Sequence, residues 1–141
     1  MKITNKKAQF DYILFDRYEA GISLLGGEVK SLKRNSVNLS QAFAKVIGNE
    51  IYLVNANIPI EGKKDYTPTR SRKLLLHKNE IVSIITKIKA KKLTLVPVKM
   101  YNKGLKIKLE LALAKSKRKF EKKEAIKKKD IERELERELK F

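Results

Sequence analysis

Two segments of the chain alternate between apolar and polar positions on either side of a turn. Residues 42–54 contain two such runs joined by Gly48-Asn49, a two-residue connection of the kind that favours positive φ. Residues 93–114 contain two more around Asn102-Lys103-Gly104, and lysines alternate with apolar residues in the second of these runs. Each segment therefore predicts an antiparallel hairpin.

The remaining pattern predicts further strands, two helices and one long loop. Strand-forming residues over 10–25 flank Glu19-Ala20-Gly21 and indicate two short strands with a bend between them. A short helix is expected over 28–34, and a longer one over 78–92, where isoleucines recur at helical spacing. Prolines, a glycine and the lack of a hydrophobic period predict a loop over 59–72.

Five or six antiparallel strands with helices packed on them favour a small barrel. The predicted fold class is mainly β (α+β): an antiparallel β-barrel like the oligonucleotide-binding (OB) fold, with two or three added helices and a basic C-terminal tail. At 141 residues the chain is long enough for one domain. We expect residues 1–114 to form the barrel and residues 115–141 to form the tail.

Apolar positions are sparse in the predicted tail. Ile131, Leu135 and Leu139 share one helical face, and most of the other residues are charged. A helix this polar gains little from packing and is marginal in water, so we expect the tail to be disordered or a frayed helix when the protein is free. A terminal helix docked on the barrel through the apolar stripe is the alternative.

Charge points to the class of partner. The chain has 34 Lys and Arg against 16 Asp and Glu, a formal net charge of +18. Residues 1–114 hold 22 basic and 9 acidic side chains, and residues 115–129 hold 9 and 2. A surface with such an excess of positive charge favours a polyanionic partner, most commonly nucleic acid. A generally lysine-rich composition or an anionic membrane surface is the alternative, but the chain has no Trp and only scattered Phe for membrane insertion.

Few residues offer catalytic or metal-binding chemistry. There is no cysteine and a single histidine, so we predict no disulfide, metal site or cofactor. Gly21 and Gly26 have the spacing of a phosphate-binding loop, but Gly27-Glu28 stand where the required Lys-Ser/Thr would be. His77 has no partner for general-base catalysis, and we interpret it as a cap or surface residue at the helix start. We therefore predict that the protein is not an enzyme.

The sequence also bears on location. It has no apolar run long enough to cross a bilayer, and the apolar core of a signal peptide is missing near the N-terminus. We expect a cytoplasmic protein without a membrane partner.

Seven runs of residues carry a resemblance to a known family. In chain order they are NKKAQFDY (5–12), YEAGISLLGGEVKSLK (18–33), NLSQAFAKV (38–46), LVNANIP (53–59), PTRSRKLLLHKNEI (68–81), LTLVPVKMY (93–101) and KIKLELALAKSKRKFEKKE (106–124). Together they cover most of the chain and resemble the SsrA-binding protein family (small protein B, SmpB), the partner of transfer-messenger RNA (tmRNA) in the rescue of stalled ribosomes.

The resemblance implies an OB-type barrel that binds the tRNA-like domain of tmRNA, and it carries over Glu28, Leu75 and Lys108 as contact positions. Lys108 would pair with a phosphate, and Leu75 would pack under an unstacked base or shape the surface. Glu28 would accept a hydrogen bond from a base edge or orient a neighbouring basic side chain. A solvated lysine, a core leucine and a helix-start glutamate are the ordinary structural alternatives.

Further basic residues complete the predicted sites. The additional RNA-binding residues are Lys30, Arg70, Arg72, Lys73 and Lys106. The resemblance implies that the tail folds as a helix in the empty messenger channel of the ribosome, near the decoding centre. The predicted ribosome-binding tail residues are Lys115, Lys117, Arg118, Lys119, Lys122, Lys123, Lys127, Lys128, Lys129, Ile131, Leu135 and Leu139.

The function implied by the resemblance is trans-translation. The protein would deliver alanyl-tmRNA to stalled ribosomes for rescue and peptide tagging, with the tail sensing the empty channel. Its partners would be the tRNA-like domain of tmRNA and the stalled ribosome, with elongation factor Tu carrying alanyl-tmRNA as a further candidate. A general structured-RNA-binding or ribosome-associated module without tmRNA specificity is the alternative.

Overall fold

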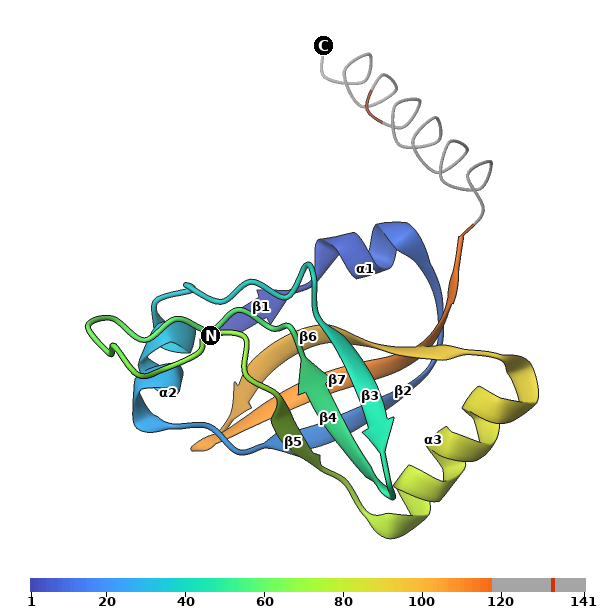
Figure 1. Ribbon diagram of the computed structural model, residues 1–141. Helices are drawn as coiled ribbons and strands as arrows, with labels where there is room; N and C mark the ends of the chain where they lie inside the picture. Colours follow the sequence, from blue (N-terminus) through green and yellow to red (C-terminus); the bar gives the residue numbers. More distant parts are fainter. Residues whose placement is uncertain (118–132, 134–141) are drawn as a thin grey trace.

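Figure 1 shows the computed structural model, which describes residues 1–117 and residue 133. Within residues 1–117 the chain forms seven strands and three helices. In chain order these are β1 Lys2–Thr4, α1 Lys6–Asp11, β2 Tyr12–Ile22, α2 Gly26–Lys33, β3 Phe43–Ile47, β4 Glu50–Val54, β5 Arg72–Leu75, α3 Lys78–Lys91, β6 Thr94–Lys103 and β7 Lys106–Ser116.

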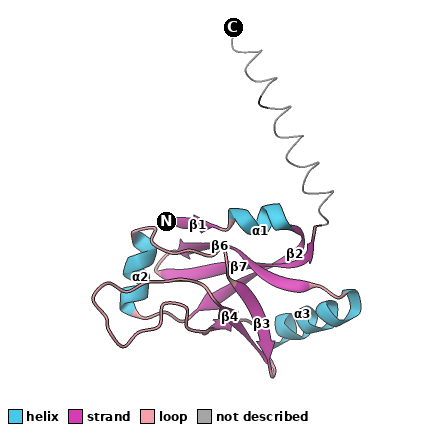
Figure 2. Ribbon diagram, turned by 45° about the horizontal axis from the view of Figure 1, so that its top comes forward, coloured by secondary structure: helices cyan, strands magenta, loops and turns pink. Residues whose placement is uncertain are grey.

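Six of these strands close into an antiparallel barrel. Neighbouring strands are hydrogen-bonded in the order β6-β3-β4-β5-β2-β7, and β7 pairs with β6 again, which completes the ring. Strand β3 meets β6 through Ala44 and Leu95, and β1 extends the sheet further along β6, where Ile3 faces Met100. Figure 2 shows the three helices around the strands. The predicted mainly β fold, an OB-like barrel with added helices, is confirmed.

Alternating apolar residues on the strands fill the barrel. Leu109, Leu111 and Leu113 lie two residues apart on β7 and are completely buried. They belong to one core cluster with Leu32 of α2 and Ile84 of α3. Both helices therefore contribute side chains to the same core as the strands, as expected for a single domain.

Helix α1 was not predicted, and the signal for it lies in the residue before it. Asn5 caps the helix, because its side-chain oxygen accepts the backbone N–H of Ala8 at 3.3 Å. The Asn5 side-chain nitrogen also donates to the Pro97 carbonyl at 2.9 Å, which ties the cap to β6. Ala8 then packs in a small separate cluster with Val96 and Ala114. Strand-forming residues from Phe10 onward masked this short helix.

The two hairpins and the two predicted helices are confirmed. Strands β3 and β4 pair in register from Phe43 with Val54 to Ile47 with Glu50, and Gly48 in the turn has φ 63°. Strands β6 and β7 pair as far as Lys103 with Lys106. Helix α2 starts two residues before its predicted start, and α3 ends one residue before its predicted end.

The predicted bend at Glu19-Ala20-Gly21 is wrong. Residues 12–22 form one continuous strand, and the break in its register with β7 lies between Leu14 and Arg17. Gly21 serves close packing here, since a Cβ at this position would lie 3.3 Å from the Cβ of Leu75 on β5. A glycine inside a strand can thus mark the close approach of another strand.

The predicted loop over 59–72 ends one residue early, because Arg72 is the first residue of β5. Strand β7 continues to Ser116, two residues beyond the predicted end of the barrel. Lys117 donates its backbone N–H to the Asp11 carbonyl at 2.9 Å. Apart from residue 133, the predicted tail residues after Lys117 lie outside the described residues. No helix in the described part of the chain is long and apolar enough to cross a membrane.

Candidate nucleic-acid interface

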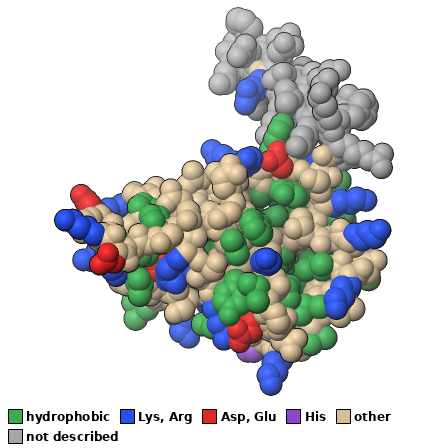
Figure 3. Space-filling view, in the orientation of Figure 1, with side chains coloured by type: hydrophobic (Ala, Val, Ile, Leu, Met, Phe, Trp, Pro, Cys, Tyr) green, Lys and Arg blue, Asp and Glu red, His purple; other side chains and the backbone are tan. Residues whose placement is uncertain are grey.

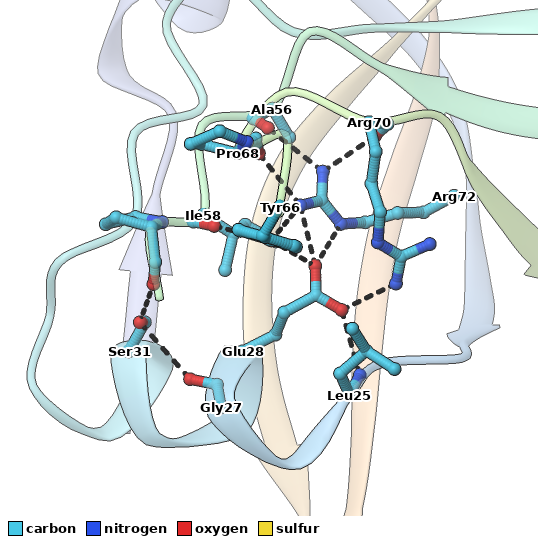
Figure 4. Close-up of polar contacts among 11 residues, drawn as sticks. Leu25, Gly27, Glu28, Ser31, Ala56, Ile58, Tyr66, Pro68, Arg70 and Arg72 are labelled. Atoms are coloured by element: carbon cyan, nitrogen blue, oxygen red, sulfur yellow. Dashed lines mark hydrogen bonds and ion pairs between the residues drawn. The ribbon is translucent and has the colours of Figure 1, made fainter. Parts of the chain in front are cut away.

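Glu28 lies at the centre of a buried ionic cluster between α2, the 59–71 loop and β5 (Figure 4). Its side chain is completely buried. One carboxylate oxygen lies 2.5 Å from Nη2 of Arg70, and the other lies 2.7 Å from Nε of Arg72. The first oxygen also accepts the backbone N–H of Leu25 at 2.8 Å, as a capping residue of α2 does.

Arg72 is committed to the protein interior. Its Nε donates to Glu28, Nη1 donates to the carbonyls of Ala56 and Arg70, and Nη2 donates to the Tyr66 hydroxyl and the Pro68 carbonyl. A guanidinium has five N–H donors, so each of them has a partner here. With 1% of the residue exposed, Arg72 cannot reach RNA as predicted, and it organises the loop instead.

The electrostatics of Glu28 follow from these partners. Burial raises the pKa of a carboxyl, but the hydrogen bonds from Arg70, the Leu25 backbone, Tyr66 and Arg72 outweigh burial and lower the pKa of Glu28 to about 2. Its carboxylate is therefore charged at neutral pH. Of the two roles considered for Glu28, the geometry fits the orientation of a neighbouring basic side chain, because its oxygens face protein donors rather than solvent.

Tyr66 was missed by the sequence reasoning, although an aromatic residue within a polar loop is a signal for an anchor. Its hydroxyl donates to Glu28 at 2.7 Å and lies 2.7 Å from the Ile58 carbonyl. Burial and the hydrogen bond to Glu28 raise the pKa of Tyr66, so the hydroxyl remains protonated. The loop that precedes β5 is thus held to α2 by Tyr66 and Arg72.

Arg70 is the member of the cluster that reaches the surface. Its side chain is 33% exposed, and its Nη2 is held by Glu28. The hydrogen bond to Glu28 raises the pKa of Arg70, so its charge is permanent. Its Nε is buried without a hydrogen-bond partner among the described residues. Arg70 therefore presents an oriented positive charge beside the loop.

An open cleft of about 790 Å³ lies where β2 and β5 end and β7 begins, and Val29 of α2 also lines it. Gly21, Leu75 and Lys108 come together in it, since Gly21 pairs with Leu75 on one side and with Lys108 on the other. Lys106, also predicted to bind RNA, lines the same cleft. Three of the predicted RNA-binding residues thus share one surface, and Leu75 is 54% exposed and not a core leucine.

Acidic groups also line the cleft, and the protein holds them in place. Glu19 accepts a hydrogen bond from the Tyr101 hydroxyl, which lowers the pKa of Glu19, and Lys103 lies 3.5 Å from it. Glu80 accepts the backbone N–H of His77 at 3.2 Å. This confirms the interpretation of His77 as a cap residue at the start of α3. The cleft therefore offers hydrogen-bond acceptors as well as positive charge.

The remaining predicted residues lie apart from the cleft. Lys30 is exposed on α2, and Lys73 of β5 forms a salt bridge of 2.8 Å with Glu50. On the face shown in Figure 3, Lys and Arg side chains are spread widely and Asp and Glu are few. Among the described residues no group of His, Asp and Glu is arranged to hold a metal ion.

The fold and the cleft define a small β-barrel protein of the oligonucleotide-binding type. The SmpB protein family model matches residues 2–141. The SsrA-binding protein of Sulfurihydrogenibium sp. (strain YO3AOP1) is 49% identical over 140 residues, which cover 97% of this chain and 92% of that protein. The SsrA-binding protein of Persephonella marina is 46% identical with the same coverage. The chain belongs to the SmpB family.

A solved structure agrees with this assignment. The chain is similar to one from the structure described as "tmRNA-SmpB: a journey to the center of the bacterial ribosome", with a TM-score of 0.68 and 42% identity. The match covers 89% of this chain and 94% of that chain. The fold and the sequence therefore lead to the same family.

Proposed function

We propose that the protein binds the tRNA-like domain of tmRNA and takes it to stalled ribosomes for trans-translation. The observation that carries the proposal is the cleft in which Leu75, Lys106 and Lys108 meet. Lysines supply phosphate contacts, and an exposed leucine supplies an apolar surface for an unstacked base. The relatives named SsrA-binding protein and the solved tmRNA-SmpB structure support the same function.

The buried cluster supports this function indirectly. Glu28 and Arg72 hold Arg70 near the end of the 59–71 loop, so that Arg70 would meet the RNA already oriented. Pre-ordered contacts lower the entropy that is lost on binding. In this proposal Glu28 is a positioning residue, while Leu75, Lys108 and Arg70 contact the RNA.

The tail and the cellular setting complete the proposal. The basic residues from Lys115 onward would neutralise ribosomal RNA phosphates in the empty messenger channel, and elongation factor Tu would accompany alanyl-tmRNA. The protein would act in the cytoplasm as a binding protein and not as an enzyme. Purified protein should accordingly leave tmRNA intact, and cleavage that is lost in the His77→Ala variant would contradict this part.

A competition assay tests the RNA partner. Full-length protein is bound to labelled tmRNA, and unlabelled tRNA or tmRNA is titrated in at near-physiological salt. We expect tmRNA to compete far better than tRNA, because the proposed contacts include an apolar surface for an unstacked base of the tmRNA domain as well as phosphate contacts that any RNA would share. Equal competition would indicate a general structured-RNA-binding module instead.

Deletion of residues 119–141 tests the role of the tail. We expect the truncated protein to bind tmRNA with nearly unchanged affinity, since the cleft is formed by residues 19–108. Peptide tagging on stalled ribosomes should be abolished. Tagging at the level of the full-length protein would contradict the assigned role of the tail.

A further inference from the structure

Leu105 is the most exposed large apolar side chain in the described part of the chain. It lies in the turn between β6 and β7, next to Gly104 with φ 63°, and it is fully exposed. A leucine there does nothing for the fold, since it contacts no core. Single exposed leucines are common on proteins, so its exposure alone carries no conclusion.

Its location makes Leu105 different from the other exposed apolar residues. Leu105 lines the same cleft as Leu75, which is 54% exposed on β5. The two leucines belong to different segments of the chain, the β6–β7 turn and β5. Val82 on α3 and Ile47 at the end of β3 are also at least half exposed, but neither lines the cleft.

Charge next to Leu105 indicates what kind of ligand would cover it. Lys106 follows it directly, Lys108 lies two residues further on, and both line the cleft. An apolar surface beside lysines suits one nucleotide, with the base against carbon atoms and the phosphate against ammonium groups. Leucine side chains are known to serve as wedges against nucleic acid bases.

We propose that Leu105 and Leu75 together hold one unpaired nucleobase of the bound RNA, while Lys106 and Lys108 contact the phosphates next to it. This rests on the proposed function and adds Leu105 as a residue that determines which RNA binds. Because a base is held only where it is unpaired and unstacked, the pair of leucines would select a loop nucleotide and reject continuous duplex.

Affinity as a function of salt tests the role of Leu105. Full-length wild type and the variants Leu105→Ala, Leu105→Phe and Val82→Ala are titrated with a transcript of the tRNA-like domain of tmRNA. We expect Leu105→Ala to weaken binding about fivefold, from the apolar area that is no longer buried. The dependence of log K on log salt should stay the same, since no charge is removed.

The other variants separate this role from an effect on folding. Leu105→Phe should bind at least as tightly as wild type, because its larger apolar surface covers the same base. Val82→Ala should bind like wild type. All three variants should melt within about 3 °C of wild type, because the substituted side chains are largely exposed.

The nucleotide is identified with RNAs that carry one abasic residue at each unpaired position in turn. At one position the abasic residue should weaken the binding of wild type about fivefold. The same RNA should bind Leu105→Ala almost as well as the intact RNA does, as expected when the base and Leu105 are partners in one contact. Unchanged affinity of Leu105→Ala, or losses that simply add at every position, would overturn the inference. If wild type binds tRNA and tmRNA equally, the proposed function fails, and the same scan on tRNA still decides whether Leu105 holds a base.

Discussion

The ionic cluster around Glu28 and the cleft around Leu105 are opposites in composition and exposure. In the cluster, Glu28 and Arg72 are charged and almost completely buried. In the cleft, Leu75 and Leu105 are apolar and largely exposed. Each region reverses the usual distribution of residues, in which charged side chains face water and leucines are buried.

The difference between the two regions shows how to separate residues that hold a binding surface in shape from residues that contact the ligand. The charges of Glu28 and Arg72 are satisfied by the protein itself, so little of either side chain is left for a ligand. The leucines of the cleft have apolar surface that the fold leaves uncovered. Glu28, which the resemblance implies as an RNA-contact position, would therefore affect binding indirectly, by holding the protein in the shape that binds.

The largest expected effect comes from breaking the cluster with Arg72→Met. The substitution leaves the buried Glu28 carboxylate without one of its two arginine partners, and we expect a loss of about 3 to 5 kcal/mol in the free energy of unfolding. Urea denaturation measures it. The control is Arg34→Met, which removes a largely exposed salt bridge of 3.1 Å to Glu61 and should change stability by less than about 0.5 kcal/mol. Similar losses in the two variants would contradict the structural role of Arg72.

The pH dependence of stability should report the ionisation of Glu28. Its pKa is about 2 in the folded protein against 4.5 for the ordinary value, so its carboxylate stabilises the fold fully above pH 4.5. This contribution is lost as the pH falls from 4.5 towards 2. Wild type should lose about 3 kcal/mol more than Glu28→Gln over this range, in urea denaturation at each pH. Parallel curves for the two proteins would show that Glu28 is not held as a charged group.

The barrel was predictable from sequence because alternation is a local signal. The hairpins at 42–54 and 93–114 repeat the strand period and have turn residues between the runs, and both were predicted correctly. Strand β5 was not found, because only four residues alternate and Arg72 occupies an inward position where an apolar residue is expected. An arginine faces inward there because Glu28, 44 residues earlier in the chain, balances its charge.

The candidate site was predictable only in part. Resemblance implied Leu75 and Lys108, and the structure brings them together with Lys106. Nothing in the sequence indicated that Glu28 and Arg72 are buried, because burial of a charged side chain depends on a partner that is far away in the chain. Leu105 was missed because a leucine beside a turn glycine looks like the start of a strand. Only the tertiary structure shows that its side chain is exposed.

The cleft is tested by Lys108→Ala. Lys108 lines the cleft and forms no salt bridge with another described residue, so its loss removes one phosphate contact. We expect tmRNA binding to weaken about tenfold and the slope of log K against log salt to fall by about one. Lys45→Ala, on β3 outside the cleft, should leave the slope unchanged. A change in melting temperature without a change in slope would mean that Lys108 is structural.

The smallest effect is expected from Lys73→Ala. This lysine shares one feature with each of the two regions. Lys73 is about half exposed, like a binding residue, but its ammonium lies 2.8 Å from the Glu50 carboxylate, like the members of the cluster. A phosphate must displace Glu50 to reach it, so the substitution should weaken RNA binding less than about threefold, with less than half the slope change of Lys108→Ala. In a Glu50→Gln background the same substitution should have a larger effect, since Lys73 is then released. If Lys73→Ala has the same effect in both backgrounds, Glu50 does not restrain this lysine, and exposure alone is the better guide to which lysines bind RNA.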